Sequence, residues 1–193
     1  MFTGIITHLG KFIGIKKSVF TFIANPAFCK KISKGTSIAV NGVCLTAFAK
    51  PAQNSFSVEV MPETQKKTML GHLKINDLTN LELPVTPTTL LSGHIVQGHI
   101  DGIAKLVRIE RNKNSHILQF SIPDNLSKYI TEKGSIAVNG ISLTIIEAKR
   151  KYFIVGIIPY TWKNTMLNTI KIGDFVNIEV DILAKYIEKL LKK

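Results

Sequence analysis

A nine-residue motif that occurs twice constrains the fold of this chain more than any other feature. The first copy, IAVNGVCLT at 38–46, returns 98 positions downstream as IAVNGISLT at 136–144, with seven of nine positions identical. A longer stretch supports the repeat, because 58–82 aligns with 155–179 without a gap and with 12 of 25 positions identical. We therefore predict one fold repeated twice, in two domains of about 90–95 residues each.

The repeated motif has the pattern of a β-hairpin. Asn41-Gly42 is a strong hairpin signal, since a type I′ turn needs positive φ at both central residues. Strand alternation then places Cys44 and Thr46 together, opposite the branched apolar residues. A thiol and a hydroxyl on one face can line a polar pocket, but a small buried cysteine and a β-forming threonine fit the pattern equally well. Ser142 replaces Cys44 in the second copy.

The remaining pattern predicts an all-β protein with a helical C-terminus. Each half contains about six short β-rich segments and one short helix, which favours a small, closed or nearly closed antiparallel barrel. The proline-containing, uncharged segment PVTPTTLLSG places a boundary between domains at 1–90 and 91–182. The segment 183–193 has no counterpart in the first half and carries apolar residues at helical spacing. Such a short helix is marginal alone, so it must pack on its own domain or, as we expect, on the same helix of another subunit.

Composition limits the partners of the chain. The net charge is +12, but the cations are almost all lysines spread along the sequence, with only three arginines. Arginine is preferred for bidentate contacts with phosphates and bases, so we expect no nucleic-acid partner. No apolar run approaches a membrane span, and the N-terminus lacks the layout of a signal peptide. Cys29 and Cys44 have no metal-binding spacing, and we expect two reduced thiols in the cytoplasm.

A second unusual stretch, GHIVQGHIDG at 93–102, carries two histidines beside glycines. His94 and His99 are five residues apart, so on a regular strand they face opposite sides, and no metal site is expected. The glycines also differ from the phosphate-binding motifs. A glycine-hinged strand remains, in which a functional histidine and a structural one are equally good interpretations.

Taken together, these residues carry a family resemblance. MFTGI, NGVCLT, GHIVQGHID, NGISLT and GDFVNIEVD resemble riboflavin synthase of the α-chain type, in order and over essentially the whole chain. The resemblance implies two six-stranded Greek-key barrels, a C-terminal helix and a homotrimer. It also implies a transferase that dismutates two molecules of 6,7-dimethyl-8-ribityllumazine by four-carbon transfer, giving riboflavin and 5-amino-6-ribitylaminouracil in the last step of riboflavin biosynthesis. It implies no metal, organic cofactor, nucleic acid or membrane.

The resemblance further implies two related pockets, one for each substrate molecule, which meet across a subunit interface. The first pocket is expected to contain Gly4, Ile5, Ile6, Ser37, Cys44, Leu45, Thr46, Glu59, Val60, Met61, Pro62, Glu63 and Thr64. The second is expected to contain Gly98, His99, Ile100, Lys133, Ser142, Leu143, Thr144, Ile158, Pro159, Tyr160, Thr161, Trp162, Lys163 and Asp181. Phe2 is expected to close a pocket against water.

Catalytic roles are implied for His99, Ser142 and Cys44. His99 is the first choice for proton transfer, because an unperturbed histidine titrates near neutrality. Ser142 and Cys44 are candidates to deliver a nucleophile or to donate a hydrogen bond to the ring. Tyr160 and Trp162 are bulkier than the residues typical of this segment, so the chain departs from the family at the second rim. The alternative is a non-catalytic lumazine- or flavin-binding antenna protein of the same superfamily, which would have lost the reactive positions.

Overall fold

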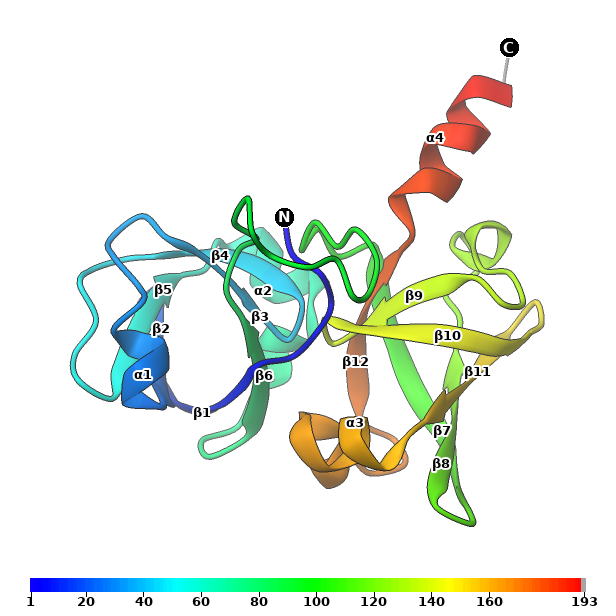
Figure 1. Cartoon of the computed structure of the whole chain (residues 1–193), viewed down its shortest axis with the longest axis horizontal. Helices are drawn as coiled ribbons and strands as arrows, with labels where there is room; N and C mark the ends of the chain where they lie inside the picture. Colours follow the sequence, from blue (N-terminus) through cyan, green and yellow to red (C-terminus); the bar gives the residue numbers. More distant parts are fainter. Residues whose placement is uncertain (192–193) are drawn as a thin grey trace.

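The computed structural model describes residues 1–191, so the last two residues of the predicted C-terminal helix lie outside the described range. Two closed antiparallel barrels stand side by side, one from each half of the chain (Figure 1). The predicted all-β architecture of two six-stranded barrels is confirmed. Within residues 1–191, no helix is long and apolar enough to cross a membrane.

The two barrels have the same strand order. The first contains β1 (His8–Lys16), β2 (Val19–Ala24), β3 (Ser37–Val40), β4 (Val43–Ala47), β5 (Ser55–Glu59) and β6 (Leu78–Glu82). The second contains β7 (Gly102–Asn112), β8 (Ser115–Ser121), β9 (Ser135–Val138), β10 (Ile141–Ala148), β11 (Tyr152–Ile157) and β12 (Phe175–Val180). Around the ring the first runs β1-β2-β5-β4-β3-β6, and the second repeats this as β7-β8-β11-β10-β9-β12. Because β3, β4 and β5 are sequential neighbours and β2 lies beside β5, the arrangement is a Greek key.

Short helices fill the connections between strands. They are α1 (Pro26–Cys29), α2 (Pro62–Lys67), η1 (Met69–His72), η2 (Ser127–Tyr129), α3 (Pro159–Asn164), η3 (Met166–Thr169) and α4 (Ile182–Leu191). The pairs α2–η1 and α3–η3 occupy equivalent places, before β6 and β12, whereas α1 and η2 differ between the halves. The C-terminal helix α4 projects away from both barrels (Figure 1).

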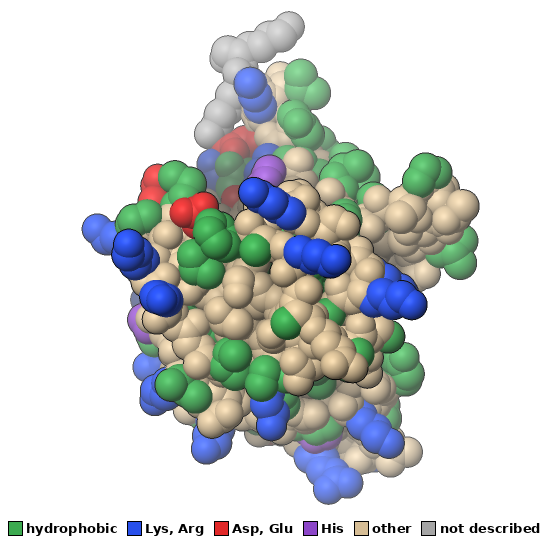
Figure 2. Space-filling model, turned by 90° about the vertical axis from the view of Figure 1, so that its left-hand side faces the viewer, with side chains coloured by type: hydrophobic (Ala, Val, Ile, Leu, Met, Phe, Trp, Pro, Cys, Tyr) green, Lys and Arg blue, Asp and Glu red, His purple; other side chains and the backbone are tan. Residues whose placement is uncertain are grey.

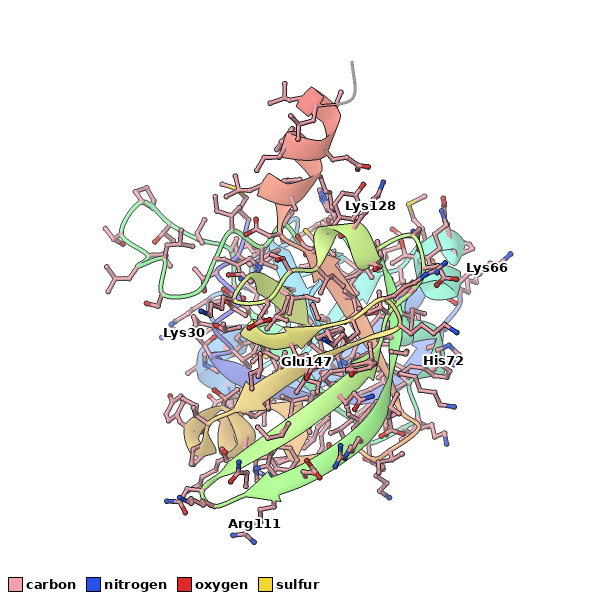
Figure 3. All side chains as sticks on the ribbon, turned by 90° about the vertical axis from the view of Figure 1, so that its right-hand side faces the viewer. Lys30, Lys66, His72, Arg111, Lys128 and Glu147 are labelled. Atoms are coloured by element: carbon pink, nitrogen blue, oxygen red, sulfur yellow. The ribbon has the colours of Figure 1, made fainter. Side chains whose placement is uncertain are left out.

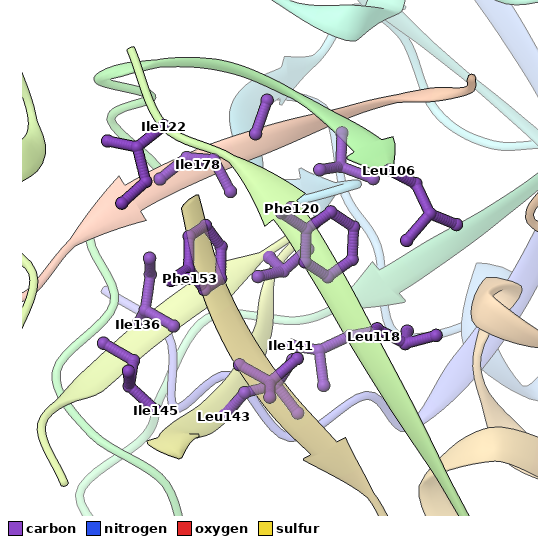
Figure 4. Close-up of a cluster of buried hydrophobic side chains, with 14 of the residues drawn as sticks. Leu106, Leu118, Phe120, Ile122, Ile136, Ile141, Leu143, Ile145, Phe153 and Ile178 are labelled. Carbon is purple, nitrogen blue, oxygen red and sulfur yellow. The ribbon is translucent and has the colours of Figure 1, made fainter. Parts of the chain in front are cut away.

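Each barrel has its own hydrophobic core. The first is rich in phenylalanine, and the rings of Phe22 and Phe56 stack with their centroids 5.5 Å apart. The second places Phe120 and Phe153, 5.4 Å apart, among aliphatic side chains (Figure 4). Since a fully buried side chain of this size contributes about 1.5–3 kcal/mol, each half stabilises its own barrel.

The turns of the repeated motif meet each other between the barrels. Asn41 and Gly42 have φ of 45° and 78°, and Asn139 and Gly140 have 46° and 77°, as type I′ turns require. A β-carbon added to Gly42 would lie 2.6 Å from the backbone nitrogen of Gly140, and the reverse approach is 2.7 Å. The glycines therefore serve the contact between the barrels as well as the turn.

Buried asparagines join the two barrels through reciprocal hydrogen bonds. Nδ2 of Asn80 donates to the carbonyl oxygen of Asn139 at 2.9 Å, and Nδ2 of Asn177 donates to that of Asn41 at 2.8 Å. Oδ1 of Asn80 and of Asn177 accept backbone N–H groups at the starts of η3 and η1, at 2.8 and 2.7 Å. An unpaired buried polar group costs about 1–3 kcal/mol, so this network fixes how one barrel sits against the other.

Positive charge is dispersed over the outer face of the first barrel. The Lys and Arg side chains on this face stand apart, with uncharged atoms between them (Figure 2). A nucleic-acid-binding surface gathers such side chains into a stripe or patch. The face seen in Figure 2 has no such gathering.

Candidate functional site

The two glycine-rich extended segments cross over between the barrels. The backbone nitrogen of Ser142 donates to the carbonyl oxygen of Gly4 at 2.8 Å. In the same way, the backbone nitrogen of Cys44 donates to the carbonyl oxygen of Gly98 at 2.9 Å. A β-carbon on Gly4 would lie 2.7 Å from Cβ of Ser142, and one on Gly98 would lie 2.6 Å from Cβ of Cys44. Both glycines also have positive φ, 76° and 82°. Only glycine permits this approach, so each candidate nucleophile faces a segment from the other half of the chain.

The predicted grouping of residues into two pockets is wrong on this point. The family resemblance implied that the N-terminal segment lines the first pocket and that 98–100 line the second. Instead Ile6 packs against the core of the second barrel and Ile100 against that of the first. Neither segment belongs to a regular strand, since β1 begins at His8 and β7 at Gly102.

Phe2 was expected to close a pocket against water, but it lies buried between the barrels. Its side chain is 1% exposed and clusters with Ala39, Val96 and Ala137. Its backbone nitrogen donates to the carbonyl oxygen of Val96 at 2.7 Å, in an isolated antiparallel bridge. The phenyl ring therefore stabilises the crossing of the two segments.

Two buried glutamates at the ends of β6 and β12 anchor the crossing segments. The carboxylate of Glu82 accepts from the backbone nitrogen and Oγ1 of Thr3, both at 2.7 Å, and from the backbone nitrogen of Gly4 at 3.1 Å. Glu179 accepts from the backbone nitrogens of 97–98 at 2.7 and 2.9 Å. Burial raises the pKa of both carboxyl groups, although these donors oppose the shift. The sequence analysis did not predict this role. The available signal was that the gapless alignment of 58–82 with 155–179 ends on a glutamate in both halves.

The two glutamates are expected to make the folded state less stable as the pH rises through the weakly acidic range. Their folded-state pKa is raised above the usual 4.5, so the folded protein binds more protons than the unfolded chain at intermediate pH. This contribution is complete below pH 4.5 and is lost as the pH rises through the raised pKa. A double variant, Glu82→Gln with Glu179→Gln, loses this slope, together with about 1–3 kcal/mol for each unpaired donor. Urea unfolding at several pH values measures the difference, and an unchanged slope would contradict the assignment.

The second barrel brings a histidine and a serine together. Nδ1 of His94 lies 2.7 Å from Oγ of Ser142, and Nε2 is buried with no hydrogen-bond partner among residues 1–191. Burial lowers the pKa of the imidazole below 6.5, while the carboxylate of Asp181 opposes the shift. The ring is therefore neutral near pH 7, when one nitrogen donates and the other accepts. This pair can pass a proton between the serine hydroxyl and the histidine.

His94 is the functional candidate that sequence reasoning failed to identify. It lies on the linker between the barrels, so the first half has no counterpart. The sequence leaves a functional role open for the histidines of 93–102, and the family resemblance assigns that role to His99 alone. His99 instead lies exposed beside the first barrel, next to Gly98, which contacts Cys44. Within the described part of the chain, no cluster of three His, Cys, Asp or Glu side chains could hold a metal ion.

Strand alternation places the remaining motif residues as predicted. Cys44 and Ser142 are half-buried, and Thr46 and Thr144 beside them are exposed. Three other predicted binding residues turn their side chains into the barrel cores: Leu45, Leu143 and Val60. Through these three positions, only the backbone can contribute to a pocket.

Equivalent segments lead from β5 into α2 and from β11 into α3, and they form exposed rims. Pro62 and Pro159 occupy the first turn of each helix, where a missing N–H costs nothing. Just before them, Met61 and Ile158 are 66% and 59% exposed, and Tyr160 is 72% exposed. These exposed apolar side chains are available for contact with a ligand or with another protein.

A cavity of about 650 Å³ between the barrels contains none of the predicted site residues. Its lining comes from equivalent positions of the two halves, such as Met69 with Met166 and Lys74 with Lys171. It lies beside η1 and η3, where the asparagine network joins the barrels. The predicted site residues lie elsewhere, where the extended segments of Gly4 and Gly98 cross, so this cavity does not locate them.

Lys133 holds an unusual backbone conformation at the edge of the second barrel. Its φ is 63°, where the first barrel has Gly35 with φ of 87°. The two backbone nitrogens make equivalent hydrogen bonds, to Ile145 and Ala47. A lysine in this region costs about 1–2 kcal/mol, and such strain is typical of functional positions. The exposed ammonium group is free to contact a ligand.

Replacing Lys133 by glycine is expected to separate stability from activity. Relief of the backbone strain leaves the free energy of unfolding unchanged or raises it by up to about 1 kcal/mol. Loss of a charged hydrogen bond to the ligand lowers the rate at least about tenfold. Urea unfolding and turnover assays measure the two effects. Lys113→Gly is the matched control, because Lys113 also has positive φ, 51°, in the β7–β8 turn. A similar loss of activity in both variants would exclude a binding role for Lys133.

Comparisons with known proteins support two similar ligand-binding halves. A family model of the lumazine binding domain matches residues 3–84 and again 97–181. The riboflavin synthase of Actinobacillus pleuropneumoniae is 44% identical over 197 residues, which cover 100% of this chain and 91% of that protein. The riboflavin synthase of Bacillus subtilis (strain 168) is 40% identical over 199 residues, with the same coverage.

Solved structures share the fold. The crystal structure of LumP complexed with riboflavin has a TM-score of 0.84 and 24% identity, covering 93% of this chain and 99% of that one. LumP complexed with 6,7-dimethyl-8-(1'-D-ribityl) lumazine has a TM-score of 0.82, 23% identity and the same coverage. At this identity the likeness concerns the arrangement of the two barrels.

Proposed function

The chain belongs to the riboflavin synthase family, built from two lumazine-binding domains, and we propose that its two crossed sites hold the two substrate molecules of one reaction. The activity is that of a transferase, which dismutates two molecules of 6,7-dimethyl-8-ribityllumazine to riboflavin and 5-amino-6-ribitylaminouracil. The observation that carries the proposal is the equivalent construction of the sites, in which Gly4 crosses to Ser142 and Gly98 crosses to Cys44. One substrate used twice needs two such sites.

The residues of the two sites suit unequal roles. One bound lumazine must lose a proton from its 7-methyl group, and the other must accept a nucleophile at C7. In the second site the neutral His94 is hydrogen-bonded to Ser142 and can accept a proton through the hydroxyl. In the first site the thiol of Cys44 and the exposed ring of His99 can orient or activate the other molecule. Holding two reactants in contact can itself supply several kcal/mol.

We further propose that the active centre forms between subunits of a homotrimer, the first barrel of one chain facing the second barrel of another. The exposed apolar rims, Met61 on one barrel and Ile158 and Tyr160 on the other, support this arrangement. They leave each site open in a single chain. The proposed centre is complete only when another subunit covers them.

The helix α4 is suited to hold the subunits together. Leu183, Ile187 and Leu190 are 57%, 57% and 76% exposed along it. Nζ of Lys185 pairs with Asp101 at 2.6 Å and fixes the start of the helix to the second barrel. Glu188 bonds to Lys128 and to the neighbouring tyrosine of η2, beside the base of α4 (Figure 3). An apolar face held rigidly outward favours packing on an equivalent helix, and sedimentation analysis measures the resulting mass.

A turnover assay tests the proposed function directly. The protein is mixed with 6,7-dimethyl-8-ribityllumazine, and riboflavin is followed by its fluorescence without any added metal or cofactor. Steady formation of riboflavin is expected. Tight binding without turnover would support the antenna alternative, and no binding would overturn both.

Cys29 and Cys44 are free thiols, in agreement with the proposed cytoplasmic location.

A further inference from the structure

The single tryptophan of the chain stacks on a histidine from a neighbouring strand. Trp162 of α3 and His116 of β8 have ring centroids 3.7 Å apart and planes inclined by 8°. Trp162 also packs against the core of the second barrel, and Nδ1 of His116 is buried without a hydrogen-bond partner in the described chain. The helix α3 lies beside the β7–β8 hairpin, whose tip carries Arg111 (Figure 3). The stack therefore ties α3 to the barrel wall face to face.

The first barrel lacks this contact at the equivalent positions. Gln65 aligns with Trp162, and Ser18 takes the place of His116, because its carbonyl oxygen accepts from the backbone nitrogen of Val60 at 2.8 Å. The Gln65 amide reaches only the carbonyl oxygen of Val60, at 3.5 Å. Local polar contacts hold both α2 and α3, and α3 has the ring stack in addition. The two rims, although equivalent in sequence position, therefore differ by one ring contact to the barrel wall.

We propose that the Trp162–His116 stack is a positioning element that preorganises the second substrate site. It holds the α3 segment that begins beyond Ile158, so the second rim keeps its shape before lumazine arrives, while the α2 rim orders on binding. Ordering of side chains and loops opposes association, so a fixed rim binds more tightly than an adjustable one. Two chemically identical substrates are then held unequally. This inference rests on the proposed function, because it takes 158–163 as part of a lumazine site.

The test installs the residues of the first barrel in the second. Trp162→Gln and His116→Ser each remove the stack, and each is expected to raise KM for lumazine about threefold to tenfold, the range that corresponds to one aromatic pair. In both variants kcat is expected to change less than about twofold, as for a group that does not touch the reacting atoms. Trp162→Phe keeps a stacked ring and should restore most of the affinity. Gln65→Ala in the first barrel is the matched control, with KM within about twofold of wild type.

Binding is also measured without turnover, by titrating riboflavin and following the fluorescence of Trp162. In wild type the signal is expected to change at the tighter of two binding steps, and in His116→Ser this step should weaken threefold to tenfold. An unchanged KM and riboflavin affinity in both folded variants would overturn the proposal. Lower thermal stability with unchanged KM would do the same, since the stack would then be structural only. Failure of wild type to form riboflavin would instead overturn the proposed function.

Discussion

Replacing His94 by glutamine is expected to lower kcat about 100-fold or more, within the usual range for loss of a general acid–base group. Glutamine can still hydrogen-bond to Ser142 but cannot accept a proton. The affinity for lumazine should change by less than about threefold, because the shape of the site is kept. Initial rates of riboflavin formation and equilibrium titration with lumazine measure the two effects.

The pH profile identifies the group further. Burial lowers the pKa of His94 below 6.5, so the neutral ring persists into weakly acidic solution, and activity falls as the pH drops through this lowered value. In His94→Gln the activity should no longer fall in this acidic pH range. His99→Gln is the matched comparison, since His99 is exposed beside the first site. A larger fall in kcat for His99→Gln than for His94→Gln would move proton transfer to the first site. Wild-type kcat in both variants would exclude the histidines altogether.

Replacing Gly42 by alanine is expected to destabilise the protein by about 2–5 kcal/mol, which combines backbone strain with overpacking. The added β-carbon would lie 2.6 Å from the nitrogen and 2.8 Å from Cα of Gly140, and backbone atoms cannot rotate away. The positive φ of 78° adds a cost that alanine cannot avoid. Separation of the barrels would also break the asparagine hydrogen bonds, so unfolding should lose cooperativity. Urea denaturation followed by circular dichroism measures the change.

Gly35→Ala separates the two causes. Gly35 also has positive φ, 87°, but an added β-carbon would meet nothing within 4 Å. We expect a loss of only about 1–2 kcal/mol there. Gly140→Ala should lower the free energy of unfolding by about as much as Gly42→Ala does. In the double variant the loss should be smaller than the sum of the two single losses, because both changes affect one contact. Equal losses for Gly42→Ala and Gly35→Ala would show that the barrels can move apart at little cost.

Local patterns in the sequence predicted the local structure well. The Asn-Gly turns and the alternation around Cys44 depend on residues close in sequence, for which turn chemistry and periodicity are reliable guides. Six strands in each half followed from the same reasoning. The C-terminal helix was predicted from apolar spacing alone.

The site was only partly predictable, because its parts meet through long-range contacts. The sequence around Gly98 does not show which barrel its extended segment will join, and the assignment taken from the family resemblance paired it with the wrong barrel. The sequence left the roles of His94 and His99 open, and the family resemblance pointed to His99, whereas the contact with Ser142 belongs to His94. The stack of Trp162 on His116 joins elements that no periodic pattern connects. Only the packed structure brings such residues together.

The crossing of the segments ties the order of synthesis to the completion of the sites. Gly4 leaves the ribosome first, yet its backbone partner, Ser142, belongs to the barrel made last. The first barrel, in turn, lacks the acceptor for the Cys44 amide until Gly98 has emerged. Contacts so distant along the chain form slowly, because the entropy of closing a long loop is lost before the contacts can stabilise it. In a nascent first half the backbone around Cys44 therefore lacks a partner, and neither site is complete before the other half of the chain has been made.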